Sequence, residues 1–147
     1  DGSGYVKLAS ADPSVQPAFN YRYLQHPNDM RRVREGLRKA VGFLESNAYK
    51  DVADYRIQPT EEILADDDAL DLYIRQTCGT ARHVTGTCKM GPDSDPMAVV
   101  DQYCSVKGVK GLSVVDASVM PRVTRSGGSH ATVVMIGERA VEWIAPA

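Results

Sequence analysis

The chain has 147 residues, of which 43% are hydrophobic and 24% are charged, and its formal net charge is −2. This is the size and composition of an ordinary globular domain that can bury an apolar core. The slightly acidic balance gives no reason to expect binding to nucleic acid or to an anionic membrane, and no apolar run approaches the roughly 18 residues of a membrane helix.

The first third of the chain predicts a short strand and then a helix. Residues 4–9, GYVKLA, place Val6 and Leu8 on one side, as a strand does. Residues 10–20 contain two prolines and predict an extended connection. A helix follows, with Asn28 as its capping residue. Its apolar stripe comprises Met30, Val33, Leu37, Ala40, Val41 and Leu44, and its solvated basic face comprises Arg31, Arg32, Arg34, Glu35, Arg38 and Lys39.

A second helix is predicted from Asp66 to Gln76. Its buried side comprises Leu70, Tyr73, Ile74 and Thr77. The run from Asp66 to Asp68 resembles a metal cluster, but acidic residues at a helix start are favoured by the positive end of the helix dipole. We therefore expect these aspartates to begin the helix and expect no metal site.

The three cysteines, Cys78, Cys88 and Cys104, are odd in number and show no zinc-site spacing. They predict reduced, partly buried thiols rather than a disulfide framework. Reduced thiols fit a reducing compartment, which weakly favours the cytoplasm; the sequence leaves the localisation open.

The last third predicts a buried strand, a polar turn and a final helix. The apolar run Leu112–Val115 ends at Asp116, which we expect at the carboxyl end of the strand. A helix from Ala131 to Ile144 is apolar on most sides and is expected to pack between layers. The order of strand, helix, helix, loop, strand and helix predicts a mixed α+β fold.

Two of the three histidines lie beside glycines. His83 lies in the segment TARHVTGTCKMGPDSDP, and His130 lies between RSGGS and the final helix. The free N–H groups of Ala131 and Thr132, together with the helix dipole, favour an anionic group, and Gly127 and Gly128 allow its close approach. Imidazole exchanges protons near neutral pH, so the two histidines are a candidate acid–base pair. Composition and spacing alone leave open that their positions are coincidental.

Three blocks of sequence resemble the glucose–methanol–choline (GMC) oxidoreductases, which are flavoproteins that oxidise alcohols. They are HVTGTCKMGPDSDPMAVVD, VKGVKGLSVVDASVMP and SGGSHATVVMIGERAVEWI, in that order. The earlier segment GSGYVKLASADPSVQPAFNYRYLQHPNDMRRVREGLRKA also looks like this family, so the resemblance covers nearly the whole chain. It implies the C-terminal part of such an enzyme, in which part of the substrate-binding domain is combined with the last strand and helix of the FAD domain.

The resemblance assigns roles to both histidines. The histidine of the family's HxxGTC motif lies in the active site by the flavin ring, and His83 matches it. A histidine or asparagine precedes the last helix, and His130 matches that position. Choline-oxidising members have asparagine there, which argues against choline as the substrate. The implied reaction passes a hydride from the alcohol carbon to flavin N5 while His83 takes the hydroxyl proton and His130 hydrogen-bonds the substrate oxygen or shares the base role.

The resemblance also implies where FAD touches this chain. The helix start at Ala131 and Thr132 would face the flavin pyrimidine and stabilise the reduced flavin. The turn at Asp116 and Ala117 matches the family's DAS or DGS turn, which contacts the ribityl or diphosphate region largely through its backbone.

The dinucleotide fingerprint GxGxxG of the family is absent. The chain also begins with Asp1 and shows no secretory signal, so we expect a piece of a longer polypeptide that continues upstream and holds most of the FAD site. Residues 1–100 then belong to the substrate-binding domain and residues 101–147 to the return into the FAD domain. The isolated chain is expected to be inactive.

Three functions follow from these observations. The first is an alcohol oxidase or dehydrogenase, with oxygen or a quinone-like compound as the electron acceptor. The second is a hydroxynitrile lyase on the same scaffold, which keeps the flavin without using its redox chemistry. The third is a stand-alone domain that binds a partner or small ligand without catalysis.

Overall fold

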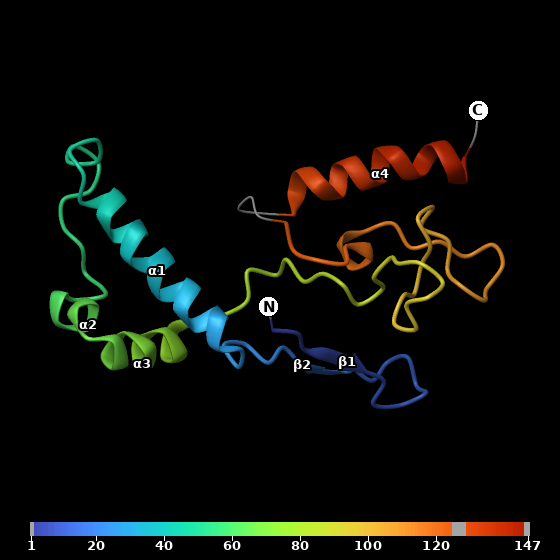
Figure 1. Ribbon diagram of the computed structural model, residues 1–147, viewed down its shortest axis with the longest axis horizontal. Helices are drawn as coiled ribbons and strands as arrows, with labels where there is room; N and C mark the ends of the chain where they lie inside the picture. Colours follow the sequence, from blue (N-terminus) through green and yellow to red (C-terminus); the bar gives the residue numbers. More distant parts are fainter. Residues whose placement is uncertain (1, 125–128, 146–147) are drawn as a thin grey trace. The chain divides into compact units, whose positions relative to one another are not determined.

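Helices and one small sheet alternate with long irregular segments in the computed structural model of the chain, which describes residues 2–124 and 129–145 (Figure 1). The chain divides into two compact units, Asp1–Gly79 and Thr80–Ala147. The α+β class expected from the sequence is confirmed. The predicted division at residue 100 concerns the substrate-binding and FAD-binding parts of a whole enzyme, and it stays a prediction.

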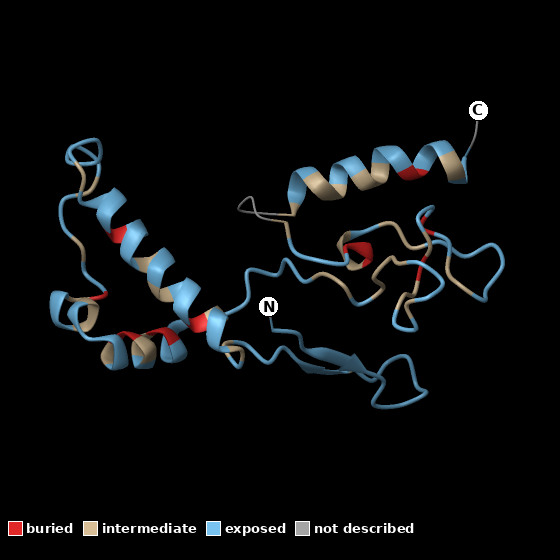
Figure 2. Ribbon diagram, in the orientation of Figure 1, coloured by how far each residue is buried: buried red, intermediate tan, exposed pale blue. Residues whose placement is uncertain are grey.

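The first unit begins with an antiparallel hairpin. Strand β1, Tyr5–Lys7, pairs with strand β2, Ala18–Asn20, so that Val6 lies opposite Phe19. Every residue of both strands is exposed (Figure 2). The strand predicted within residues 4–9 is confirmed, whereas the connection predicted over 10–20 is wrong in its last three residues, because these pair with β1.

Helix α1, Pro27–Leu44, confirms the first predicted helix but not its cap. The capping residue is His26, whose Nδ1 accepts the N–H of Asn28 at 3.2 Å. Pro27 occupies the first helical turn, where a missing N–H costs nothing and the fixed φ suits a helix. The helix therefore starts before Asn28 rather than at it.

Helix α3, Asp67–Thr77, confirms the second predicted helix, and the side chain of Asp66 caps it by accepting the N–H of Ala69 at 2.8 Å. Leu70 and Ile74 of this helix form a buried cluster with Met30 of α1. Each such side chain stabilises the unit by about 1.5–3 kcal/mol relative to exposure. The short helix α2, Glu61–Ala65, which was not predicted, adds Ile63 and Leu64 to the same cluster.

The basic face of α1 is exposed as predicted except at Arg34, and two of its arginines also bind neighbouring residues. Arg38 donates to Asp67 of α3 at 2.7 Å and to the carbonyl oxygen of Leu64 at 2.9 Å. Arg34 also forms an ion pair with Asp67. These contacts fix α1 against α3, so both arginines belong to the packing of the first unit.

The second unit is built around a cluster of Val100, Cys104 and Val119, each at most 1% exposed. The strand predicted at Leu112–Val115 is wrong: within the described residues this run contributes only an isolated bridge between Ser105 and Ser113. Gly111 has a φ of +73° before the run, and Asp116 caps a 3₁₀ turn after it. The run is therefore too short to extend a ladder.

Helix α4, His130–Ile144, confirms the last predicted helix. Ile136 and Trp143 pack against the buried cluster of the second unit. The expectation that α4 is covered on most sides is not met by the described residues, because Val134, Met135 and Val141 are all more than half exposed. No helix in residues 2–124 and 129–145 is both long and apolar enough to cross a membrane.

The three cysteines are free thiols, and the predicted burial is confirmed for two of them. Cys78 is exposed, Cys88 is half-buried and Cys104 is buried. Burial, with a smaller contribution from the nearby Asp101 charge, raises the pKa of the Cys104 thiol. Cys104 therefore remains a neutral core residue.

Candidate functional site

His83 lies on an irregular segment at the start of the second unit, and its side chain is exposed. The residue before it, Arg82, has a φ of +62°, and its N–H donates to the hydroxyl oxygen of Thr80 at 2.9 Å. Gly86, three residues after His83, has a φ of +83°. His83 thus lies between two left-handed backbone positions, where the chain changes direction.

The segment after His83 is hydrogen-bonded to the turn that contains Asp116. Cys88 donates its N–H to the carbonyl oxygen of Ser118 at 3.0 Å, and Met90 donates to Val119 at 2.8 Å. These two bonds join residues that are 30 and 29 positions apart in sequence. The structure therefore brings the His83 segment and the predicted cofactor-binding turn together.

Asp116 and Ala117 form the start of that turn. The Asp116 carboxylate accepts the N–H of Ser118 at 2.7 Å and also its hydroxyl, so it caps the 3₁₀ helix Ala117–Val119. Val119 is fully buried in the core of the second unit, and this fixes the turn in place. Both bonds go to Oδ1 of the carboxylate, and they tie this side chain to the turn.

The start of α4 offers backbone donors. Ser129 precedes the helix without a side-chain capping bond, and the first N–H bonded to the preceding turn is that of Val133, at 2.8 Å from the Ser129 oxygen. Within the described residues the N–H groups of Ala131 and Thr132 therefore have no partner. Ala131 is exposed and Thr132 is half-buried. Gly127 and Gly128, predicted to allow close approach, lie outside the described residues.

His130 is the first residue of α4 and is exposed, like His83. Neither imidazole has a hydrogen-bond partner among residues 2–124 and 129–145. Both histidines lie on segments of the second unit that pack against the cluster of Val100, Cys104 and Val119. Met90 makes this contact for the His83 segment, and Ile136 makes it for α4. The structure records no contact between the two side chains, so their pairing stays a prediction.

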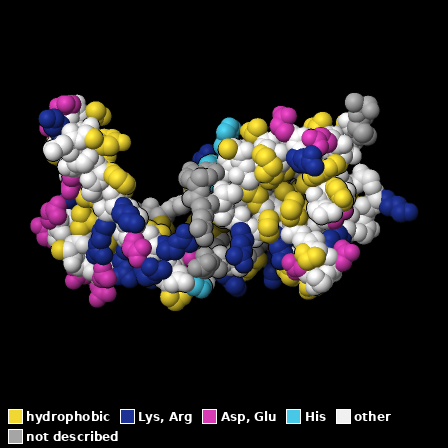
Figure 3. Space-filling view, turned by 45° about the horizontal axis from the view of Figure 1, so that its top comes forward, with side chains coloured by type: hydrophobic (Ala, Val, Ile, Leu, Met, Phe, Trp, Pro, Cys, Tyr) yellow, Lys and Arg dark blue, Asp and Glu magenta, His cyan; other side chains and the backbone are white. Residues whose placement is uncertain are grey.

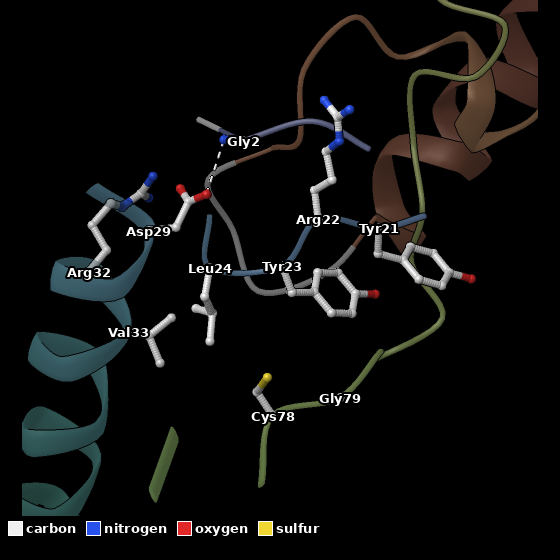
Figure 4. Close-up of a pocket in the computed structure, with 10 residues that line it drawn as sticks. All are labelled: Gly2, Tyr21, Arg22, Tyr23, Leu24, Asp29, Arg32, Val33, Cys78 and Gly79. Atoms are coloured by element: carbon white, nitrogen blue, oxygen red, sulfur yellow. Dashed lines mark hydrogen bonds between the residues drawn. The ribbon is translucent and has the colours of Figure 1, made fainter. Parts of the chain in front are cut away.

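An open groove of about 510 Å³ lies in the first unit, and the sequence analysis did not find it (Figure 4). Its wall includes Tyr21, Tyr23 and Leu24 before α1 and Cys78 after α3. Asp29, the acidic residue of this wall, accepts the N–H of Gly2 at 3.0 Å. Arg22, another wall residue, lies over the ring of Tyr5. Asp29 and Arg22 are therefore already engaged, and Arg32 is the third charged residue of the wall. The described residues also contain no group of acidic, histidine and cysteine side chains that suits a metal ion.

The left-handed conformation of Arg82 is the feature of the site that sequence reasoning missed. Arginine has no preference for that conformation, so no residue type marks the position. The one available signal is Thr80, two residues earlier, because threonine hydroxyls close local turns of this kind.

Comparison with known proteins gives a consistent set of relatives. A family model described as GMC oxidoreductase matches residues 1–137. A GMC-type oxidoreductase of Rhodococcus erythropolis is 40% identical over 137 residues, which are 93% of this chain and 26% of that protein. An oxygen-dependent choline dehydrogenase of Rhizobium rhizogenes is 38% identical over 141 residues, which are 96% of this chain and 25% of that protein.

Solved structures show the same likeness. A formate oxidase from Aspergillus oryzae, studied for modification of its FAD, aligns with a TM-score of 0.81 and 31% identity. The alignment covers 98% of this chain and 25% of the oxidase. The chain therefore spans about a quarter of the length of the relatives it matches.

Proposed function

The chain belongs to the GMC oxidoreductase family, and on this basis we propose that it forms the C-terminal portion of an FAD-dependent alcohol oxidase or dehydrogenase. The observation that carries the proposal is the pair of hydrogen bonds from Cys88 to Ser118 and from Met90 to Val119. They tie the segment of the candidate base His83 to the turn proposed to contact FAD.

Exposed apolar surface supports the view that this chain works as part of a larger protein. Hydrophobic side chains are open to the surface on both units (Figure 3). Phe19 on β2 and Met135 on α4 are each 56% exposed, and Phe43 on α1 is 68% exposed. Such surface is normally covered by further protein. We propose that the remaining polypeptide covers it and supplies most of the FAD site.

Residues at the start of α4 and in the Asp116–Ala117 turn suit contact with FAD. The N–H groups of Ala131 and Thr132, which have no partner within the described residues, lie at the positive end of the 15-residue α4 and suit an electron-rich, anionic edge of a flavin. The Asp116–Ala117 turn is held by the bonds from Ser118 to Asp116 Oδ1, so its backbone is kept in one conformation for contact with a ribityl or phosphate group. When bound, FAD would supply the acceptor, at N5, for the hydride that leaves the alcohol carbon.

The proposed roles of the histidines follow from their chemistry. His83 is exposed and has no hydrogen-bond partner within residues 2–124 and 129–145, so its imidazole can accept a proton from a substrate hydroxyl, and we assign this role to it. His130 would hydrogen-bond the substrate oxygen or share the base role. Its position at the start of α4 puts it next to the N–H groups assigned to the flavin.

The proposed substrate is a small alcohol. Similarity to a choline dehydrogenase supports this class. The histidine at position 130, where choline-oxidising members are expected to carry asparagine, argues against choline itself. Oxygen or a quinone-like compound would reoxidise the flavin.

The experiment that tests the function is performed on the protein expressed from the whole upstream reading frame. Its visible spectrum is recorded under anaerobic conditions while a panel of primary alcohols is added. Loss of the oxidised-flavin absorption is the expected result. A flavin that stays oxidised with every alcohol while the protein cleaves a cyanohydrin would identify the lyase instead, and a protein that binds no flavin would contradict both.

A further inference from the structure

The segment that carries His83 is held at both ends by backbone geometry. On one side Arg82 is left-handed, and on the other Gly86 is left-handed. Beyond Gly86 the chain is fixed to the 3₁₀ turn by the N–H of Cys88. Residues 83–85 are therefore a short span whose direction is set by the two flanking positions.

Glycine adopts the left-handed conformation without steric cost, but arginine does not. The structure shows what offsets this cost at position 82. The N–H of Arg82 donates to the hydroxyl oxygen of Thr80 at 2.9 Å, which closes a local turn. The main chain on the other side of His83 needs no such support, because residue 86 is glycine.

We propose that Arg82 and Thr80 are positioning residues for the reaction, and that they act by setting the backbone direction at His83. This inference rests on the proposed function, because it takes His83 to be the base. A left-handed residue reverses the local course of the chain, so a change of Arg82 to an extended conformation turns the following peptide and moves the imidazole. A displacement of about 1 Å of a catalytic group lowers a rate by on the order of 10²-fold.

The proposal makes the guanidinium group dispensable. Asparagine and glycine tolerate the left-handed conformation, whereas a β-branched residue does not. Arg82→Asn, Arg82→Gly and Arg82→Val all remove the positive charge, and they differ in the backbone conformation that they allow. They are therefore matched variants that separate backbone geometry from charge.

The experiment measures kcat, KM, flavin content and thermal midpoint in the full-length enzyme. Arg82→Asn and Arg82→Gly are expected to keep kcat within a few-fold of the wild type, and Arg82→Val is expected to lose on the order of 10²-fold in kcat with little change in KM. Flavin content stays unchanged in all three. Equal losses in Arg82→Asn and Arg82→Val would overturn the proposal in favour of a role for the charge, and unchanged kcat in Arg82→Val would overturn it outright.

If Arg82→Val does not fold, a second pair of variants tests whether the Thr80–Arg82 turn positions His83. Thr80→Ser keeps the hydroxyl and is expected to keep kcat, whereas Thr80→Ala loses a hydrogen bond and is expected to lower kcat about fivefold. Equal kcat in these two would contradict the proposal. His83→Ala separates the base role of His83 from the positioning role of Arg82 and Thr80. If this variant retains wild-type kcat, the base assignment fails and the positioning role fails with it.

Discussion

Cys88 donates its backbone N–H to the carbonyl oxygen of Ser118 at 3.0 Å, and this bond joins the His83 segment to the turn capped by Asp116. Ser118 lies next to the buried cluster of the second unit, since Val119 follows it and is fully buried. Met90, two residues after Cys88, packs against the same cluster. The segment of the proposed base and the turn proposed to bind the cofactor are thereby joined at one core. The relative position of base and cofactor in the proposed enzyme depends on this core.

Gly86→Ala tests how strictly the His83 segment needs its left-handed positions. Gly86 has a φ of +83°, and an added Cβ would lie 3.5 Å from the oxygen of Met120, so the cost comes from the backbone rather than from a clash. We expect a loss of about 1–2 kcal/mol in the free energy of unfolding, measured by denaturant or thermal unfolding.

Gly36→Ala in α1 is the matched control. It lies mid-helix and an added Cβ meets nothing within 4 Å, so alanine is expected to stabilise the helix by about 0.5–1 kcal/mol. Changes of the same sign in the two variants would contradict the account of Gly86.

Leu70→Ala tests the core of the first unit. Leu70 is 0% exposed and packs with Met30 and Ile74, so its truncation leaves a cavity and is expected to cost about 2–5 kcal/mol. Leu72→Ala on the same helix is the control, because Leu72 is 57% exposed and its truncation is expected to change stability by about 0.5 kcal/mol or less. Equal shifts of the thermal midpoint would show that α3 packs with a different face.

The stability that the α1–α3 contact gives to the first unit is expected to depend on pH through Asp67. The hydrogen bond from Arg38, with the nearby Arg34 charge, holds the pKa of the Asp67 carboxyl below its ordinary value. A carboxyl whose pKa is lower in the folded state stabilises the fold above its unfolded pKa, about 3.9, and loses this contribution as the pH falls through the folded value. Asp67→Asn is therefore expected to lower the thermal midpoint at pH 7 and to have little effect near pH 2.

The control for Asp67 is Asp68→Asn, since Asp68 forms no ion pair within the described part of the chain. The Asp67 side chain is 58% exposed, so the expected shift at pH 7 is small but larger than that of Asp68→Asn. A difference between wild type and Asp67→Asn that grows toward acid would refute the assignment.

Helices with clear periodicity and the short strand β1 were predictable from the sequence, whereas strand β2 was not. The stripe from Met30 to Val41 and the acidic start at Asp66 specify α1 and α3 because helical spacing and capping are local signals. Strand β2 has three residues, and its existence depends on pairing with β1, which is a non-local event. The run at Leu112–Val115 has the composition of a strand, but glycine and aspartate on either side bend the chain before a ladder forms.

The candidate site was predictable in its residue types but not in its backbone. Motif resemblance singled out His83, His130 and the Asp116 turn, and the structure brings two of these three segments together by hydrogen bonds. The left-handed Arg82 follows from the fold around it, because an arginine by itself favours other conformations. The relatives are about four times as long as this chain, and we propose that further polypeptide supplies much of the pocket.

The rate of anaerobic flavin reduction by an alcohol substrate, measured in the full-length protein for wild type, His83→Asn and His130→Asn, tests the central claim most directly. Asparagine can hydrogen-bond an alcohol oxygen but cannot accept its proton at neutral pH. We predict that His83→Asn lowers the rate by on the order of 10²–10⁴-fold with flavin still bound, and that His130→Asn lowers it less. Wild-type reduction rates in His83→Asn would contradict the claim that this histidine is the base.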